Sequence, residues 1–272
     1  MNYKNSAVQG YKMSITPTYK CVLLDIEGTT TPISFVHDRL FSYVKNNLVN
    51  FLNENWNSLE LQEQIQLLRE QATKDVNNNL SDAILVPEVQ QGKKTNEEEI
   101  KKAIIQNIQW QMKINRKIGA LKSFQGFMWE SGYESGELKG EIFDDVLDAL
   151  KKWKESGIKI YIYSSGSISA QKSLFKNSDK GDLTEYIDGY FDTSIGSKIE
   201  KSSYVNIAKE IQFEPRDILF LSDNVKEIIS AKSVCYQAAI IERKNNMPLS
   251  DDDRKNNIIF TDFLQIFSYS FL

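Results

Sequence analysis

The sequence predicts a doubly wound α/β fold, in which helices cover both faces of a parallel, Rossmann-like sheet that carries a helical insertion. Short continuous apolar runs are typical of strands buried on both faces. Segments with helical apolar spacing alternate with the later runs, as in parallel sheets. A long, mostly helical segment separates the first run from the others. The four clearest runs lie at residues 21–26, 158–163, 218–221 and 237–241.

The pattern divides the chain into a core and an insertion. We expect the α/β core to comprise residues 19–36 and 137–272, and a helical cap to comprise residues 37–136. Residues 1–18 are polar and are expected to form a loose extension. Apolar side chains recur at helical spacing within 40–52, 61–68 and 100–112, with loop sequence through Gly92. We expect residues 124–140, rich in glycine and aromatics, to return the chain to the core, and residues 243–257 to form a surface loop.

Composition excludes several classes of protein. The chain has 272 residues, of which 41% are apolar and 26% charged, as in ordinary globular proteins. A net charge of -4 gives no basic surface for nucleic acid. No apolar run approaches the roughly 18 residues of a membrane span, and no signal segment is expected. Cys21 and Cys235 lie in apolar runs and are expected to be buried, reduced thiols.

Residues that could take part in catalysis or ligand binding follow the predicted strands. In open α/β sheets, ligands bind beyond the carboxyl ends of the strands. The side chains at those positions are Asp25 and Glu27, then Ser164 and Ser165, then Lys198, and finally Asp223. Asp25 is suited to attack phosphorus as a nucleophile, and Glu27 to act as general acid and base. Asp25 alone would equally fit a residue that caps a turn, but two carboxylates separated by one residue favour a catalytic role.

The remaining residues of this set suggest phosphate and metal binding. Hydroxyl and backbone N–H groups of Ser164 and Ser165 at a helix start suit an anion, although such a sequence is also an ordinary helix cap. Lys198 would hold a phosphate oxygen, or else lie in solvent. Asp223 could join Asp25 in binding Mg²⁺, which prefers oxygen ligands. Glu227 could assist the metal ion from its outer sphere, but it is expected to face solvent. The lone His37 could act as an acid or base near the pocket entrance, but its position at a helix start favours a structural role. The sequence contains no zinc-type His/Cys cluster and no P-loop.

Five segments together resemble the haloacid dehalogenase-like hydrolases and, among them, the enolase-phosphatase E1 family. Most phosphatases of that superfamily carry Asp-x-Asp at the first segment, where this chain has Asp25-Ile26-Glu27. The order and spacing of the segments agree with the family across about residues 19–270. The segments are DIEGTTTPISFV at 25–36, YSSGS at 163–167, GSK at 196–198, LFLSD at 219–223 and PLSDD at 248–252.

This resemblance implies a Mg²⁺-dependent bifunctional enzyme of L-methionine salvage. Such enzymes enolise 2,3-diketo-5-methylthiopentyl-1-phosphate and then remove phosphate to give the acireductone. The resemblance further implies a monomer with one Mg²⁺ in the cytoplasm, sometimes also in the nucleus. By position, Asp25 would be nucleophile and Mg²⁺ ligand, and Glu27 would bind Mg²⁺ through its backbone carbonyl and serve as acid and base. Ser164, Ser165 and Lys198 would bind phosphate, and Asp223 would ligate Mg²⁺.

Two departures and three alternatives accompany the resemblance. Ser197 stands where the family often has His, and Ser222 where it commonly has Thr, but neither change removes a catalytic atom. A generic metabolite phosphatase is one alternative, and Glu27 with the following Thr-rich run argues against it. A dehalogenase would have no use for Glu27 or for a metal site at Asp223. A catalytically silent binding protein would be expected to lack Asp25, Lys198 or Asp223.

Overall fold

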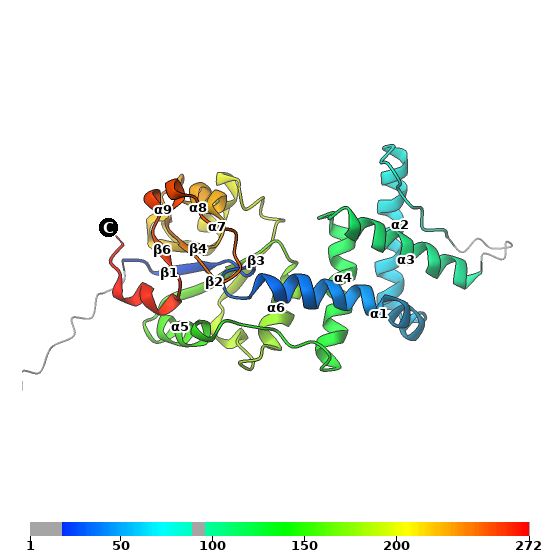
Figure 1. Cartoon of the computed structure of the whole chain (residues 1–272), viewed down its shortest axis with the longest axis horizontal. Helices are drawn as coiled ribbons and strands as arrows, with labels where there is room; N and C mark the ends of the chain where they lie inside the picture. The colour runs from blue at the N-terminus through cyan, green and yellow to red at the C-terminus, as the bar shows by residue number, and fades with distance from the viewer. Residues whose placement is uncertain (1–17, 89–95, 272) are drawn as a thin grey trace, which may run out of the picture.

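A six-stranded parallel sheet forms the centre of the computed structural model, which describes residues 18–88 and 96–271 (Figure 1). The strand order is β3-β2-β1-β4-β5-β6, and every neighbouring pair is parallel. This arrangement confirms the predicted fold class. The strands are β1 (Cys21–Leu24), β2 (Lys159–Tyr163), β3 (Gly189–Phe191), β4 (Ile218–Ser222), β5 (Gln237–Ile241) and β6 (Ile259–Phe260).

Helices cover both faces of the sheet because successive side chains of each strand point to opposite sides. Val22 and Leu24 of β1 belong to one apolar cluster with side chains of α5 and α6. Cys21 and Leu23 belong to a second cluster with side chains of α7 and α8. The helices outside the insertion are α5 (Asp144–Glu155), α6 (Ile168–Lys176), α7 (Lys201–Ile211), α8 (Val225–Lys232) and α9 (Asp251–Asn256).

Four helices follow β1 and build a third apolar cluster of their own. Figure 1 shows them gathered to one side of the sheet. A π-helix at Phe35–Leu40 leads into the first of them. Ser58 and Asn96 cap the second and third helices, each accepting a hydrogen bond from a backbone N–H of the first turn. The four are α1 (Phe41–Asn55), α2 (Leu59–Asn77), α3 (Glu97–Lys113) and α4 (Gly119–Glu134).

Helix α4 corrects the expectation that residues 124–140 simply return the chain to the core. Its glycines resemble helix breakers in the sequence, since glycine weakens a helix interior. In the structure Gly132 allows close packing. A Cβ at Gly132 would lie 2.7 Å from Tyr43 Cζ and 2.8 Å from Leu138 Cδ1, whereas one at Gly126 would make an ordinary contact, 3.6 Å from Ser167 Oγ. Packing against neighbouring segments therefore stabilises a helix that composition disfavours.

The segment at 243–257 is also more ordered than expected for a surface loop. Helix α9 begins at a capping box, in which Ser250 and Asp253 each accept a hydrogen bond from the other's backbone N–H. Arg243 is buried, where its guanidinium pairs with Asp145 at 2.9 Å. Cys235 corrects a further expectation, since it lies exposed at a positive φ of 69° just before β5.

The predicted N-terminal extension and the loop through Gly92 lie outside the described residues, apart from Thr18. Thr18 Oγ1 lies 2.9 Å from Gln237 Oε1 and 3.0 Å from the Phe271 carbonyl. Across 18–88 and 96–271, none of the helices is both long and apolar enough to cross a membrane.

The buried pair of Asp145 and Arg243 generates a stability prediction. Asp145→Ala would leave the guanidinium buried without a carboxylate, which costs about 3–5 kcal/mol when a buried pair is broken. Equilibrium unfolding in urea would measure this loss of folding free energy. Asp144→Ala is the matched control, because the Asp144 side chain is 97% exposed and should change stability little. Equal stability of Asp145→Ala and the wild type would contradict the prediction.

Candidate active site

The carboxyl ends of the central strands bring the predicted residues to one edge of the sheet. Leu24 at the end of β1 pairs with Ile162 of β2 and with Leu221 of β4. The Asp25 N–H donates to the Leu221 carbonyl at 3.0 Å and so continues the ladder by one residue. The residues following these three strands therefore meet at one place, as the sequence predicts.

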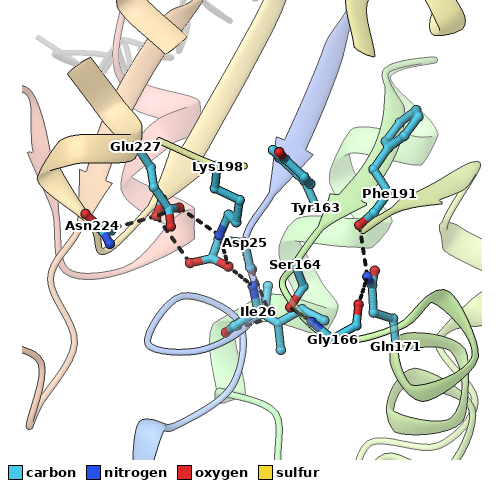
Figure 2. Close-up of polar contacts among 12 residues, drawn as sticks. Asp25, Ile26, Tyr163, Ser164, Gly166, Gln171, Phe191, Lys198, Asn224 and Glu227 are labelled. Atoms are coloured by element: carbon cyan, nitrogen blue, oxygen red, sulfur yellow. Dashed lines mark hydrogen bonds and ion pairs between the residues drawn. The ribbon is translucent and has the colours of Figure 1, made fainter. Parts of the chain in front are cut away.

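Asp25 and Lys198 form a buried ion pair at the centre of this edge (Figure 2). Lys198 Nζ lies 2.5 Å from Asp25 Oδ1, and their side chains are 9% and 7% exposed. The Ile26 N–H also donates to Asp25 Oδ1, at 2.7 Å. The solvent-facing alternative for Lys198 is therefore wrong, and the Asp25 carboxylate is fixed in orientation.

Glu227 corrects the expectation that it faces solvent. Its carboxylate is buried, and Oε2 lies 2.7 Å from Lys198 Nζ. Burial alone would lower the pKa of Lys198, but the charges of Asp25 and Glu227 outweigh burial and hold that pKa above its ordinary value. Lys198 thus remains a cation between two carboxylates.

The hydroxyl of Ser222 joins the two carboxylates. Ser222 Oγ lies 2.8 Å from Glu227 Oε2 and 3.2 Å from Asp25 Oδ2. It also accepts a hydrogen bond from the Asn224 N–H at 3.1 Å. The sequence could have indicated a role for Glu227 at the site, because Glu227 lies in the first turn of α8, the helix that begins directly after β4.

Glu27 lies beside this cluster and contacts a different partner. Glu27 Oε1 is 3.2 Å from His37 Nε2, and burial raises the pKa of the Glu27 carboxyl, with His37 opposing and Asp25 adding to the shift. The turn that carries Glu27 requires glycine at the next position. Gly28 has a φ of +73°, and a Cβ there would lie 2.5 Å from Asp223 Oδ2.

Ser164 and Ser165 follow β2 and do not cap the next helix. Ser167 does so, accepting a hydrogen bond from the Ala170 N–H at 3.3 Å. Ser164 Oγ accepts from the Gly166 N–H at 3.3 Å, and Gln171 Nε2 donates to the carbonyls of Gly166 and Phe191 (Figure 2). Ser167 is therefore the helix cap. Ser164 and Ser165 lie in a loop that the hydrogen bonds of Gln171 hold in place.

A cleft of about 560 Å³ lies between this edge of the sheet and the helices after β1. Ile26, Glu27 and residues 164–167 line it from the sheet side. The inserted helices contribute cations and apolar side chains, a combination suited to a small anion with an apolar part. Sequence reasoning missed most of these side chains. They include Lys45, Met112, Arg116, Lys117, Leu121, Lys122, Gln125 and Trp129.

Two aromatic residues of α4 differ in their surroundings. Trp129 lines the cleft, and its Nε1–H donates to the Leu40 carbonyl at 2.8 Å. Phe127 packs against Phe51 with ring centroids 5.3 Å apart, inside the cluster formed by the inserted helices. Of the two, Trp129 is the one placed to meet a ligand.

The donor set at the strand ends fits a magnesium ion. Burial, followed by the charges of Asp25 and Glu227, raises the pKa of Asp223 to about 7, so a cation would relieve the repulsion among these carboxylates. Within the described part of the chain, no three His, Cys, Asp or Glu side chains converge as a ready ligand cluster. Asp25, Asp223 and the Glu27 backbone carbonyl are the groups here that could hold such an ion together with waters, as Mg²⁺ sites commonly do.

Comparisons with known proteins agree with this fold. A family model described as haloacid dehalogenase-like hydrolase matches residues 19–234. Enolase-phosphatase E1 of Xenopus tropicalis is 47% identical, covering 93% of this chain and 96% of its own. Enolase-phosphatase E1 of Danio rerio is 42% identical, covering 93% of this chain and 97% of its own.

A solved structure agrees as well. The UTR4 protein of Saccharomyces cerevisiae superposes with a TM-score of 0.70 at 30% identity, covering 90% of this chain and 98% of its own. The fold and the matched model define a haloacid dehalogenase-like hydrolase. Within that class, the chain belongs to the enolase-phosphatase E1 family.

The contact between Glu227 and Lys198 generates the first site prediction. Glu227→Gln removes a charge-assisted hydrogen bond to Lys198, and such bonds are worth about 1.5–3 kcal/mol. If the loss is expressed in the transition state, kcat/KM falls about ten- to a hundredfold. Steady-state kinetics would measure it, with the exposed Glu210→Gln as control. Wild-type kinetics in Glu227→Gln would show that Glu227 does not support Lys198.

The raised pKa of Asp223 generates a second prediction. Because this pKa lies above its ordinary value of 3.8, the protonated carboxyl stabilises the metal-free fold, and that contribution is lost as pH rises through about 7. Mg²⁺ requires the ionised form, so its stabilising effect should grow between about pH 6 and about pH 8. Thermal unfolding with and without Mg²⁺ would measure it. Asp223→Asn should abolish the pH-dependent gain, whereas equal gains at both pH values in the wild type would contradict the prediction.

Proposed function

We propose that this chain is a Mg²⁺-dependent enolase-phosphatase of L-methionine salvage. It would convert 2,3-diketo-5-methylthiopentyl-1-phosphate to 1,2-dihydroxy-3-keto-5-methylthiopentene and phosphate. The buried pair of Asp25 and Lys198 is the observation that carries this proposal. It supplies an oriented carboxylate nucleophile beside a fixed cation, and Asp25 directly precedes Ile26 and Glu27, which line the cleft.

In the phosphatase step, a carboxylate oxygen of Asp25 attacks phosphorus. The bond from phosphorus to the ester oxygen breaks, and Glu27 gives its proton to the leaving oxygen. Water then attacks the aspartyl-phosphate, with Glu27 accepting a proton, and Asp25 is regenerated. Lys198 holds a phosphate oxygen, and the hydroxyls of Ser164 and Ser165 bind the others. Mg²⁺, when bound at Asp25, Asp223 and the Glu27 carbonyl, would offset the negative charge shared by nucleophile and phosphate.

The inserted helices would act as the cap of this enzyme, spanning residues 37–136 between core segments 19–36 and 137–272. Support comes from their separate apolar cluster and from their contribution of one wall of the cleft. A cap of this kind excludes water from the reacting groups. We further propose that the enzyme acts as a monomer with one Mg²⁺, in the cytoplasm and in some settings the nucleus.

The test is a coupled assay of purified protein with the diketo phosphate and Mg²⁺. Enol absorbance and released phosphate are followed separately. Asp25→Asn should lower phosphate release by about a thousandfold or more, because it removes the nucleophile. Asp148→Asn, at an exposed position of α5, is the control.

The outcomes separate the alternatives. An enol signal that survives in Asp25→Asn would show that enolisation and phosphate release use different groups. Phosphate release from generic esters alone would replace the proposal with a general phosphatase. Absence of any turnover by the wild type would favour a catalytically silent binding protein.

A further inference from the structure

Lys122 is a cation that the inserted helices place against the loop after β2. It belongs to α4, and its Nζ donates to the Ser165 carbonyl at 2.8 Å. A second, longer contact of 3.5 Å joins Nζ to Thr193 Oγ1. Lysine has three N–H donors, so these two partners leave one for a ligand. Lys122 also lines the cleft, as does Ser165.

The other cleft cations are engaged elsewhere or held less firmly. Arg116 forms a two-pronged ion pair with Asp75 inside the cluster of inserted helices. Lys45 and Lys117 are exposed, and exposed lysines lose much of their electrostatic effect to water. Lys122 is half-buried, and burial lowers the pKa of its ammonium, with Asp192 opposing and Lys117 adding to that effect. Among the cleft cations of the described chain, Lys122 is the one anchored beside the predicted phosphate loop.

We propose that Lys122 is a catalytic residue of the enolisation step, binding the carbonyl oxygen next to the phosphate-bearing carbon. The proposal rests on the proposed function and assigns a group to its first reaction. In the diketo phosphate, that carbonyl carbon is bonded directly to the carbon carrying the phosphate ester. An ammonium that contacts the Ser165 carbonyl therefore lies beside a phosphate bound by Ser164 and Ser165, and so close to the carbonyl on the neighbouring carbon.

The chemistry requires a base and a group that holds the developing charge. The C–H bond on the phosphate-bearing carbon breaks, and its proton goes to a carboxylate, for which Glu27 lies in the same cleft. The electron pair forms the carbon–carbon double bond, and the carbonyl π pair moves to oxygen. Lys122 holds that oxyanion through an N–H bond until a proton from solvent reaches it. Glu27 keeps the proton taken from carbon, donates it to the leaving oxygen in the phosphatase step, and returns a proton to solvent after water has hydrolysed the aspartyl-phosphate. Fixed donors aimed at developing charge commonly supply a large share of catalysis.

A purely structural role for Lys122 makes a different prediction. As a latch between α4 and the loop at Ser165, it would affect every phosphate ester equally. p-Nitrophenyl phosphate has no carbonyl to enolise and reports only the phosphatase step. Comparing the two substrates therefore separates catalysis of enolisation from support of the phosphate loop.

The experiment compares Lys122→Met with the wild type on both substrates in saturating Mg²⁺. Removing one oxyanion donor typically lowers kcat about a hundred- to a thousandfold. We expect a loss of that size in enol formation, exceeding the loss in p-nitrophenyl phosphate hydrolysis at least about tenfold. Lys122→Arg, which keeps a cation, should recover part of the enolisation. Lys113→Met, at an exposed position of α3 outside the cleft, is the control.

Two results would overturn the proposal. Enol formation in Lys122→Met at the wild-type rate would show that Lys122 does not contact the reacting carbonyl. Equal losses on both substrates would assign Lys122 to the structural latch. A wild-type protein that hydrolyses p-nitrophenyl phosphate but never forms enol would refute the proposed function itself, and with it the enolisation role of Lys122.

Discussion

A buried cation between two carboxylates is the constraint on which the site depends. Lys198 contacts both Asp25 and Glu227, and each of the three side chains is nearly withdrawn from solvent. Charges at such depth are tolerated only when they are paired and hydrogen-bonded. The hydroxyl of Ser222 and the Ile26 N–H complete that pairing. The arrangement fixes the carboxylate of Asp25 before any substrate arrives, which is the preorganisation that a nucleophile needs.

Segments remote in sequence hold the loop after β1 in the shape that this cluster requires. Asn246 Nδ2 donates to the Gly28 carbonyl at 2.9 Å, and Arg243 Nε donates to the Thr29 carbonyl at 3.1 Å. Arg243 is itself held by Asp145 and lies 4.3 Å from the centroid of the Phe143 ring. Asn246 and Arg243, which follow β5, thus hold the turn at Gly28 and Thr29 that comes directly after Asp25 and Glu27. Stability of the core and geometry of the site are coupled through these contacts.

The two walls of the cleft have opposite chemical character. The sheet side contributes the carboxylate of Glu27 and the loop at 164–167, whereas the insertion adds lysines, an arginine and apolar side chains. A phosphorylated ligand with an apolar tail complements both walls. Helix α4 approaches the loop after β2 through Lys122, whose Nζ donates to the Ser165 carbonyl at 2.8 Å. The insertion thereby supplies chemistry at a site whose reacting carboxylates all come from the core.

The sequence by itself determined the parallel sheet, the insertion after β1 and the group of residues at the strand ends. Continuous apolar runs and alternating helical segments are local patterns, and parallel strands necessarily bring residues such as Asp25 and Asp223 to one edge. Only the tertiary structure decided that Glu227 is buried, that Arg243 lies in the core and that Lys122 reaches Ser165. Those contacts join segments far apart in the chain, and each depends on packing rather than on local composition. Helix α4 is the clearest case, because its glycines weaken a helix locally, yet Gly132 permits the close contact with Tyr43 and Leu138 that helps to stabilise it.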